Sequence, residues 1–307
     1  MKLLEVEVLQ SPLQVVIMRK RFWLMEVSMK FTKMQGCGND YVYVNCLKET
    51  VKDANALAKK VSDRHFGIGS DGLILIKESK DADFTMHMYN VDGSQGEMCG
   101  NTIRCVGKYV YDHKMTDKKK LSIETLGGIK YLDLTVENEK VTMVTVDMGE
   151  PILTPNKIPI LVEADQVIDM PIQVEDREFH LTAISVGNPH GVVFVEDTKS
   201  FPIELYGPKF EHHPLFPERV NTEFVQVLNR KEINMRVWER GSDETWACGT
   251  GATCSAYACI LNGLTEDEVT VHMLGGDLII RYDRETNHLF MTGPAVEVYE
   301  GTIDINL

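Results

Sequence analysis

Two cysteines stand in a context that suits acid/base chemistry. Cys99 is followed by Gly-Asn and Cys248 by Gly-Thr, and each precedes a segment that is predicted to be helical. The free N–H groups and positive dipole at a helix start lower the pKa of a thiol from about 8.5 and can also hold a carboxylate. Two such thiols facing each other could remove a proton from one face of a carbon and deliver one to the other, which inverts that centre.

An internal repeat makes these two cysteines equivalent. Residues 38–41 (Gly-Asn-Asp-Tyr) are echoed by residues 187–190 (Gly-Asn-Pro-His), and residues 99–101 by residues 248–250. The offset is 149 positions in both cases, from 39 to 188 and from 99 to 248. Several markers in one register indicate a duplicated chain, and a length of 307 residues allows two cores.

The elements that would position these cysteines are mostly strands. Alternating or β-branched runs predict strands at 73–76, 121–124, 141–144, 223–227 and 278–280. Segments 102–112 and 252–261 predict one largely buried helix in each half, directly after its cysteine. We therefore expect an α+β fold of two pseudo-symmetric domains, at 29–148 with a returning strand at 292–307, and at 149–291. Residues 1–28 lie outside the repeat and are interpreted as a disordered extension or as a start codon placed too early, before Met29.

Charge and composition limit the partners. The net charge of −14 at pH 7 disfavours nucleic acid and anionic membrane surfaces. No apolar run approaches the roughly 20 residues that span a bilayer, and no signal-peptide pattern is visible, so we expect a cytoplasmic protein. We also predict no metal site, because the sequence has no Cys-x-x-Cys pair and no His-x-x-x-His pair.

The other five cysteines carry weaker signals. Seven cysteines without a secretory signal make a disulfide framework improbable. Cys105 lies six residues after Cys99, and Cys254 lies six residues after Cys248. Six residues correspond to roughly 240° around a helix, so these thiols do not share a face with the two candidate thiols. Together with Cys46 and Cys259 we interpret them as structural thiols. Cys37 lies in a glycine turn, and its role stays open.

These residues resemble the diaminopimelate epimerase family, whose members interconvert LL- and meso-2,6-diaminopimelate without pyridoxal phosphate, in lysine and peptidoglycan precursor biosynthesis. The resemblance covers nearly everything from Met29 onward and rests on residues 30–34, 38–40, 90–94, 99–101, 187–190, 221–223, 239–241 and 247–251. It implies two duplicated domains, each a curved, mainly antiparallel sheet around a central helix. It also implies that no cofactor is needed, that the partner is a small-molecule substrate, and that the protein forms a homodimer.

The resemblance also assigns roles to individual residues. Cys99 and Cys248 would be the acid and the base, with His190 and Glu239 adjusting their pKa values. The substrate contacts would be Asn39, Asn90, Gly100, Asn101, Asn188, Asn221, Glu239, Arg240, Gly249 and Thr250. Amides that both donate and accept, with one arginine that can fork onto a carboxylate, suit a substrate bearing two amino-acid heads.

Two departures and three alternatives accompany this hypothesis. Many family members have glycine where this chain has Thr102, and some have a substrate-contacting glutamine where it has Gly72. A proline or hydroxyproline racemase of the same architecture is the main alternative, but Asn39, Asn221 and Arg240 would then have no distal amino-acid head to hold. A thiol redox protein would need a resolving cysteine nearby. A non-catalytic scaffold would not explain why both cysteines precede helices.

Overall fold

The computed structural model describes residues 28–304, so nearly all of the extension expected at residues 1–28 lies outside the described residues. The first half contains β1 (Ser28–Gly36), β2 (Asn39–Asn45), α1 (Ala54–Ser62), β3 (Gly72–Lys77), β4 (Phe84–Asn90), β5 (Gln95–Gly96), α2 (Gly100–Asp112), β6 (Lys120–Thr125), β7 (Gly128–Glu137) and β8 (Lys140–Gly149). The short 3-10 helix η1 (Pro155–Lys157) follows.

The second half runs in the same order. It contains β9 (Met170–Val174), β10 (Arg177–Ser185), β11 (Pro189–Phe194), α3 (Ile203–Glu211), β12 (Asn221–Asn229), β13 (Glu232–Glu239), β14 (Asp243–Thr245), α4 (Gly249–Leu261), β15 (Glu268–Met273), β16 (Gly276–Asp283), β17 (His288–Gly293) and β18 (Val296–Asp304). Strands with four helices and one short 3-10 helix, in two similar halves, confirm the α+β fold.

Strand pairing repeats between the halves. In the first half the strands pair in the order β18-β1-β2-β3-β4-β6-β7-β8, and in the second half in the order β9-β10-β11-β12-β13-β15-β16-β17. The parallel pairs β2–β3 and β4–β6 have their counterparts in β11–β12 and β13–β15. The register of these pairs makes Gly72 the counterpart of Asn221, since Leu73 lies opposite Val42 and Thr222 opposite Gly191.

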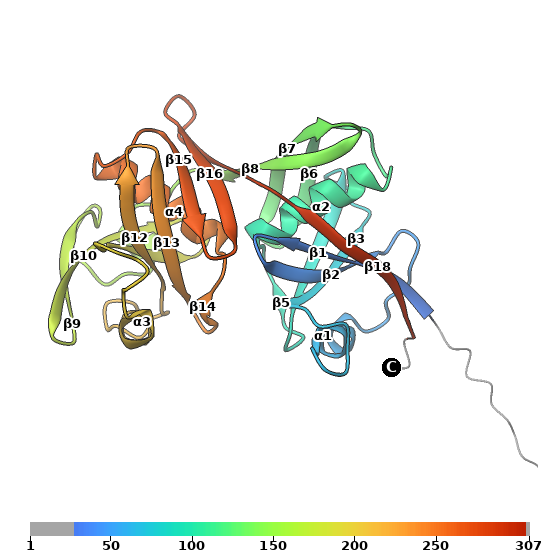
Figure 1. The fold of residues 1–307 in the computed structure, drawn as a ribbon, viewed down its shortest axis with the longest axis horizontal. Helices are drawn as coiled ribbons and strands as arrows, with labels where there is room; N and C mark the ends of the chain where they lie inside the picture. Colours follow the sequence, from blue (N-terminus) through green and yellow to red (C-terminus); the bar gives the residue numbers. More distant parts are fainter. Residues whose placement is uncertain (1–27, 305–307) are drawn as a thin grey trace, which may run out of the picture.

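Two strands join the halves. β8 pairs antiparallel with β17, and β18 leaves the second half to pair along the whole of β1, from Ser28 opposite Asp304 to Gln35 opposite Val296. Figure 1 shows the halves as two lobes, with α2 in one, α4 in the other, and β8 and the segment entering β18 running between them. One continuous sheet therefore passes through both lobes.

Helices lie on both sides of the sheets. The large apolar cluster surrounds α2 and α4 and continues through both halves, whereas smaller clusters lie beneath α1 and α3. The buried helix predicted after each cysteine is confirmed in α2 and α4, whereas α1 and α3 were not predicted. In α1 only Leu57, Ala58 and Val61 form the buried apolar stripe, and α3 contains Pro208, so neither gave a clear helical pattern.

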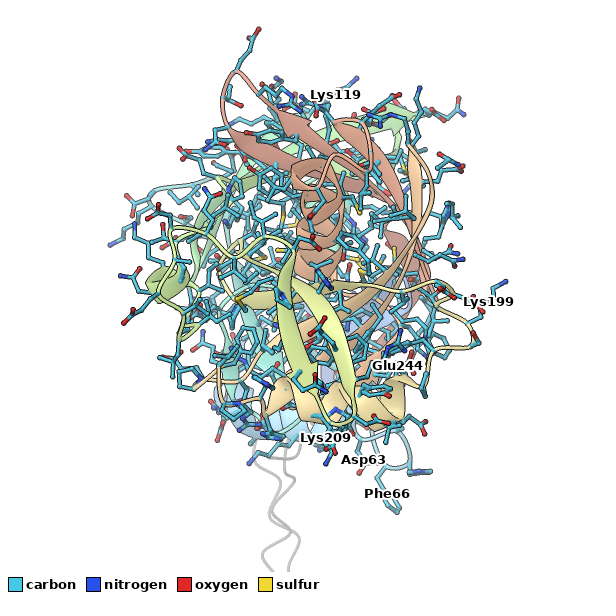
Figure 2. All side chains as sticks on the ribbon, turned by 90° about the vertical axis from the view of Figure 1, so that its left-hand side faces the viewer. Asp63, Phe66, Lys119, Lys199, Lys209 and Glu244 are labelled. Atoms are coloured by element: carbon cyan, nitrogen blue, oxygen red, sulfur yellow. The ribbon has the colours of Figure 1, made fainter. Side chains whose placement is uncertain are left out.

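Charged side chains such as Lys119, Lys199 and Lys209 project from the surface (Figure 2).

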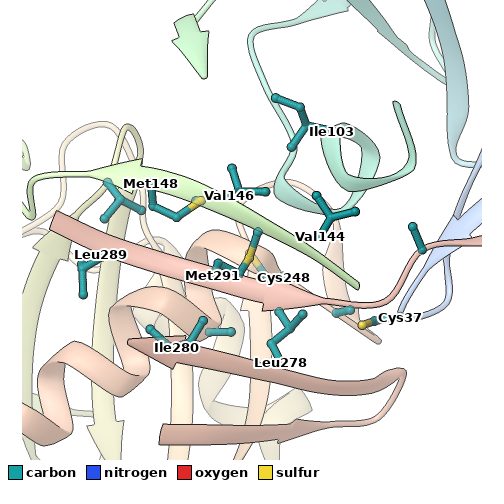
Figure 3. Close-up of a cluster of buried hydrophobic side chains, with 14 of the residues drawn as sticks. Cys37, Ile103, Val144, Val146, Met148, Cys248, Leu278, Ile280, Leu289 and Met291 are labelled. Carbon is teal, nitrogen blue, oxygen red and sulfur yellow. The ribbon is translucent and has the colours of Figure 1, made fainter. Parts of the chain in front are cut away.

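The starts of α2 and α4 meet at two glycines. A Cβ added to Gly249 would lie 3.4 Å from the Gly100 Cα and 3.0 Å from the Met291 Sδ, so larger residues would push the helices apart. The Asn101 Nδ2 donates to the Ala247 carbonyl across this contact at 3.1 Å. Met291 of β17 lies beside Cys248 and near Val144 and Val146 of β8 (Figure 3). The sequence pattern after each cysteine therefore brings the two candidate thiols to one place.

Arg104 fixes this junction. Its side chain is fully buried, with Nη1 donating to the Gly100 carbonyl at 3.0 Å and Nε to the Pro294 carbonyl at 3.2 Å. Its Nη2 donates to the Asn101 Oδ1 at 3.0 Å. Between residues 28 and 304 no carboxylate forms an ion pair with it, so its charge is solvated by these dipoles. The chain crossing at Pro294 is thus tied to the start of α2.

Replacing Arg104 with methionine should lower the free energy of unfolding by about 2–4 kcal/mol, because buried carbonyl oxygens then lose their donors. Urea titration followed by circular dichroism measures this change. Arg284→Met removes an exposed pair with Asp267 and should cost less than about 1 kcal/mol. Equal effects of the two substitutions would contradict a junction role for Arg104.

Among the described helices, none has the length and apolar character needed to span a membrane.

Candidate active site

Cys99 is the N-cap residue of α2, and a neighbouring amide holds its thiol. Its Sγ donates to the Asn39 Oδ1 at 3.5 Å, and the Asn39 Nδ2 donates to the Asp71 Oδ2 at 2.9 Å. The same Asp71 oxygen accepts from the Asp40 backbone N–H at 3.1 Å. Asp71 therefore orients Asn39 toward Cys99. Sequence reasoning missed this role, because Asp71 is distant in sequence from both Asn39 and Cys99. The repeat gives no hint either, since the matching position in the second half is Val220.

Two cations support this corner. Lys33 forms an ion pair with Asp40, and the Arg64 Nη2 lies 3.0 Å from carboxylate oxygens of both Asp40 and Asp71. Burial opposes ionisation of Asp40, but its bonds to Lys33 and Arg64 lower its pKa below the usual range. Burial raises the pKa of Asp71, although the Asp40 N–H and Asn39 oppose that rise. The corner behind Asn39 is therefore a tightly hydrogen-bonded charge network.

Cys248 occupies the matching position at the start of α4. Its Sγ accepts from the Gly251 backbone N–H at 3.4 Å and lies 3.4 Å from the Thr250 Oγ1. The residue is buried, with 6% of its surface exposed. A helix N–H group thus bonds to the Cys248 sulfur.

The pKa values of both thiols are nevertheless raised. Burial is the largest cause for Cys99, and backbone N–H groups at Thr102 and Asn101 partly offset it. Cys248 is raised well above the ordinary value, by burial first and then by the charges of Glu239 and Glu223. The expectation that a helix start would lower these pKa values underestimated desolvation in the closed core.

Glu239 ends β13 within electrostatic reach of both thiols. Its carboxylate accepts a hydrogen bond from the Thr245 hydroxyl, and burial raises its pKa. Its charge raises the pKa of Cys99 and of Cys248 alike. The Glu239 carboxylate therefore acts on the ionisation of both thiols.

His190 lies fully buried on β11 between two oxygen atoms. Its Nδ1 is 2.7 Å from the Glu223 Oε1, and its Nε2 is 3.0 Å from the Asn188 Oδ1. Glu223 is also fully buried. Sequence reasoning missed it, because Glu223 reads as one position in an apolar strand, and the parallel pairing of β11 with β12 brings it to His190. Burial raises the pKa of Glu223, although His190 opposes that rise.

Asn221 and Arg240 form the outer side of the second half's site. The Asn221 Nδ2 donates to the Pro189 carbonyl at 2.9 Å, and its Oδ1 accepts from the Arg240 backbone N–H at 2.9 Å. The Arg240 guanidinium is exposed and donates to the Glu218 carbonyl at 3.1 Å. Asn221 therefore sets the backbone of the two turns that carry Asn188 and Arg240.

The remaining residues singled out from the sequence differ in how far their side chains are engaged in hydrogen bonds within the protein. Asn90 ends β4, where its Nδ2 donates to the Ser94 Oγ at 3.0 Å. The Asn101 side chain is fully engaged at the junction of the helices, so only its backbone N–H faces the helix start. Thr102 turns its hydroxyl to the Cys99 carbonyl at 2.9 Å and packs against Met86 and Met88. Thr102 therefore points into the core beside the first turn of α2.

Gly72 cannot carry a side chain in this structure. A Cβ there would press on the Tyr89 carbonyl and would lie 2.6 Å from the Tyr41 Cε1. The Tyr41 ring is buried in the place that a longer residue would need. The Tyr41 ring therefore fills the space beside Gly72. This chain lacks the contact that a glutamine at position 72 would make.

The other cysteines are mostly structural. Cys105, Cys254 and Cys259 are fully buried, and Cys46 is half-buried. Cys37 adopts φ 53° in its glycine turn, with its Sγ 3.6 Å from the Arg104 Nη2. Its place is therefore in the junction rather than beside either candidate thiol.

Ligand-type atoms gather in two places among residues 28–304. Those of His190, Glu223 and Cys248 lie within 4.8 Å of one another, and those of His113, Glu297 and Glu300 do so at the surface. Both ring nitrogens of His190 are already hydrogen-bonded, so the ring has no free lone pair for a metal. The buried group is suited to holding protons.

The duplicated α+β fold thus places one thiol at the start of each of two abutting helices. Solved structures of this fold include a hydroxyproline epimerase from Agrobacterium vitis, with a TM-score of 0.64, 13% identity and coverage of 90% of this chain and 91% of that one. A probable proline racemase from Agrobacterium radiobacter gives a TM-score of 0.67 at 12% identity, covering 91% of this chain and 93% of that one. At these identities the likeness concerns the fold.

Sequence comparison narrows the class. The diaminopimelate epimerase family pattern matches residues 31–154 and 182–298. A diaminopimelate epimerase from Agathobacter rectalis is 62% identical, with 90% of this chain and all of that protein aligned. The one from Acetivibrio thermocellus is 57% identical, with 91% and 99% aligned. This chain belongs to the diaminopimelate epimerase family.

Replacing Gly72 with alanine should destabilise the protein by about 1–3 kcal/mol, because the new methyl group overpacks against Tyr89 and Tyr41. Thermal unfolding by calorimetry measures the loss. Gly127→Ala is the matched control: its Cβ would meet nothing closer than 3.5 Å, and it should change stability by less than about 0.5 kcal/mol. A fully stable Gly72→Ala variant would show that the space beside Tyr41 is open.

Proposed function

We propose that Cys99 and Cys248 interconvert LL- and meso-2,6-diaminopimelate as a base and acid pair. One thiolate removes the α-proton, and the thiol on the opposite side delivers a proton to the other face of the same carbon, so the centre is inverted. The observation that carries this proposal is the contact of two helix starts at Gly100 and Gly249, each with a thiol at its N-cap. This chemistry uses no group beyond the chain's own residues.

The helix starts also supply the electrostatic part of the reaction. Negative charge develops on the α-carbon and its carboxylate as the proton leaves. We propose that backbone N–H groups at Gly100, Asn101, Gly249 and Thr250 hold that carboxylate, because two positive helix ends converge there. Donors that are already oriented need no rearrangement at the moment of proton transfer.

The different surroundings of the two thiols suggest the resting state. Cys99, with helix N–H groups partly offsetting its burial, is proposed as the thiolate that attacks first, and Cys248, beside Glu239 and Glu223, as the thiol that donates. The reverse reaction exchanges these roles. Because both thiols are raised, the reaction rate should increase as pH rises through the pKa of Cys99.

Substrate recognition is proposed to follow the family assignment. Asn39, Asn90, Asn188, Asn221, Glu239 and Arg240 would hold the ammonium and carboxylate groups of the two amino-acid heads. Asn39 and Asn188 occupy matching turns of the two halves, and the exposed guanidinium of Arg240 is available for a distal carboxylate. A cyclic imino acid, the alternative substrate, has no second head to use Arg240.

We further propose that residues 29–148 with 292–307 act as one domain and residues 149–291 as the other. The pairing of β18 with β1 supports this division. A cytoplasmic location is likewise proposed, because all seven cysteines are free thiols.

Incubation with LL-diaminopimelate in deuterated buffer tests the function. The meso isomer should form with one deuterium at the inverted α-carbon, without added pyridoxal phosphate. Cys99→Ser and Cys248→Ser should each lower kcat by at least about 100-fold, because serine is a far weaker acid than a thiol. Cys46→Ser, away from both helix starts, should keep full activity. Unlabelled product, or full activity in either catalytic variant, would overturn the mechanism.

A homodimer is proposed through β18, whose second edge has no partner strand within residues 28–304. Val296, Val298 and Tyr299 are each more than 40% exposed on it. Sedimentation equilibrium should give a dimer for the unmodified chain and a monomer for Val298→Lys. A monomer at micromolar concentration without any substitution would refute the proposal.

A further inference from the structure

Glu223 and His190 form a fully buried pair directly behind Cys248. The 2.7 Å contact joins the Glu223 Oε1 to the His190 Nδ1, and both side chains have 0% exposure. The second carboxylate oxygen, Oε2, is also buried and has no hydrogen-bond partner among the described residues. A buried carboxyl group without full hydrogen bonding is costly to keep. Packing alone would favour an apolar side chain at this place.

The pair holds a defined number of protons. The His190 Nε2 faces the Asn188 Oδ1, which accepts, so Nε2 carries a hydrogen. One further proton lies between Nδ1 and the Glu223 carboxylate, on whichever atom holds it. In either case the carboxylate end of the pair is the one that lies beside Gly251 and Cys248.

A glycine lets this pair reach the start of α4. A Cβ at Gly251 would lie 2.6 Å from the Glu223 Oε1 and 3.2 Å from the Cys248 Sγ. Gly251 also donates its N–H to that sulfur at 3.4 Å. The carboxylate and the thiol therefore lie close to the same helix residue, which only a glycine leaves room for.

Other charged or titratable groups face the pair from two elements. They are Cys248 and Cys254 on α4, and Glu239 at the end of β13. No basic side chain forms an ion pair with Glu223 among residues 28–304 apart from His190. Removal of Glu223 would leave Glu239 as the one carboxylate acting on Cys248.

We propose that Glu223 is a positioning residue: it fixes the His190 ring with its Nε2–H on Asn188, and it keeps Cys248 in the thiol form. This inference rests on the proposed two-cysteine mechanism. It adds a reason why Cys248 and not Cys99 is held as the protonated thiol. Cys99, in the matching position, has no such pair behind it, because the residue equivalent to Glu223 is Ile74 and the one equivalent to His190 is Tyr41. The duplicated site is asymmetric at this point.

Two substitutions separate charge from position. Glu223→Gln keeps the shape and removes the charge, so kcat should fall about 10- to 100-fold. The alkaline limb of kcat/KM should also move to lower pH, because the Cys248 thiol ionises more easily without the neighbouring carboxylate. Glu223→Asp keeps the charge but is too short to reach Nδ1, so kcat should fall while the alkaline limb stays. KM should change less than about threefold in both variants, since the fully buried Glu223 cannot touch substrate.

A second readout is independent of turnover. Alkylation of Cys248 by iodoacetamide, followed by mass spectrometry across pH in a Cys99→Ala background, should shift to lower pH on addition of Glu223→Gln. If the unmodified chain fails to epimerise diaminopimelate, the proposed function falls while this measurement still tests the pair. A shift without catalysis would keep the inference and reject the function.

Asp112→Asn is the matched control, because Asp112 is another buried, hydrogen-bonded carboxylate, at the end of α2 and bonded to Lys108 and the Val141 N–H. It should lower stability without moving the alkaline limb or the Cys248 alkylation profile. The proposal is overturned if Glu223→Gln behaves like Asp112→Asn, with both pH profiles unchanged. It is also overturned if Glu223→Gln retains unmodified kcat.

Discussion

The whole structure depends on bringing together two helix ends of the same polarity. α2 and α4 meet at Gly100 and Gly249, where unsatisfied N–H groups of both helices converge, and the buried Arg104 adds another positive charge nearby. The positive ends of the two helices repel each other unless negative charge lies between them. Glu239, which acts on both thiols, supplies part of that charge. A thiolate and the carboxylate of a bound amino acid would supply the rest, so binding would offset the repulsion between the two helix ends.

The sheet is what holds these ends against each other. Because β8 pairs with β17, the two halves share one hydrogen-bonded sheet, and the apolar cluster beneath it surrounds both helices. Met291 packs under both glycines, and Arg104 ties the crossing at Pro294 to the start of α2. Proton transfer between facing groups is sensitive to displacements of about 1 Å. The junction therefore combines rigidity with the smallest residues that allow close approach.

The sequence predicts the repeat, the α+β class and the helix after each cysteine, because these follow from local periodicity and from markers at one offset. It does not predict α1 and α3, whose apolar stripes are short or interrupted by Pro208. Asp71 and Glu223 also escape prediction, since each acts on a residue brought near only by strand pairing. Local pattern likewise favours lower thiol pKa values, whereas burial, which depends on the finished core, raises them.

The return of β18 to β1 has a consequence for how the protein is made. The first strand of the fold, beginning at Ser28, finds its outer partner in residues up to Asp304, the last ones described. During synthesis one edge of β1 therefore stays open until the residues of β18 have emerged from the ribosome. An open strand edge invites pairing with other chains. The charged residues of β1, among them Lys30 and Lys33, are of the kind that discourages such pairing during this interval.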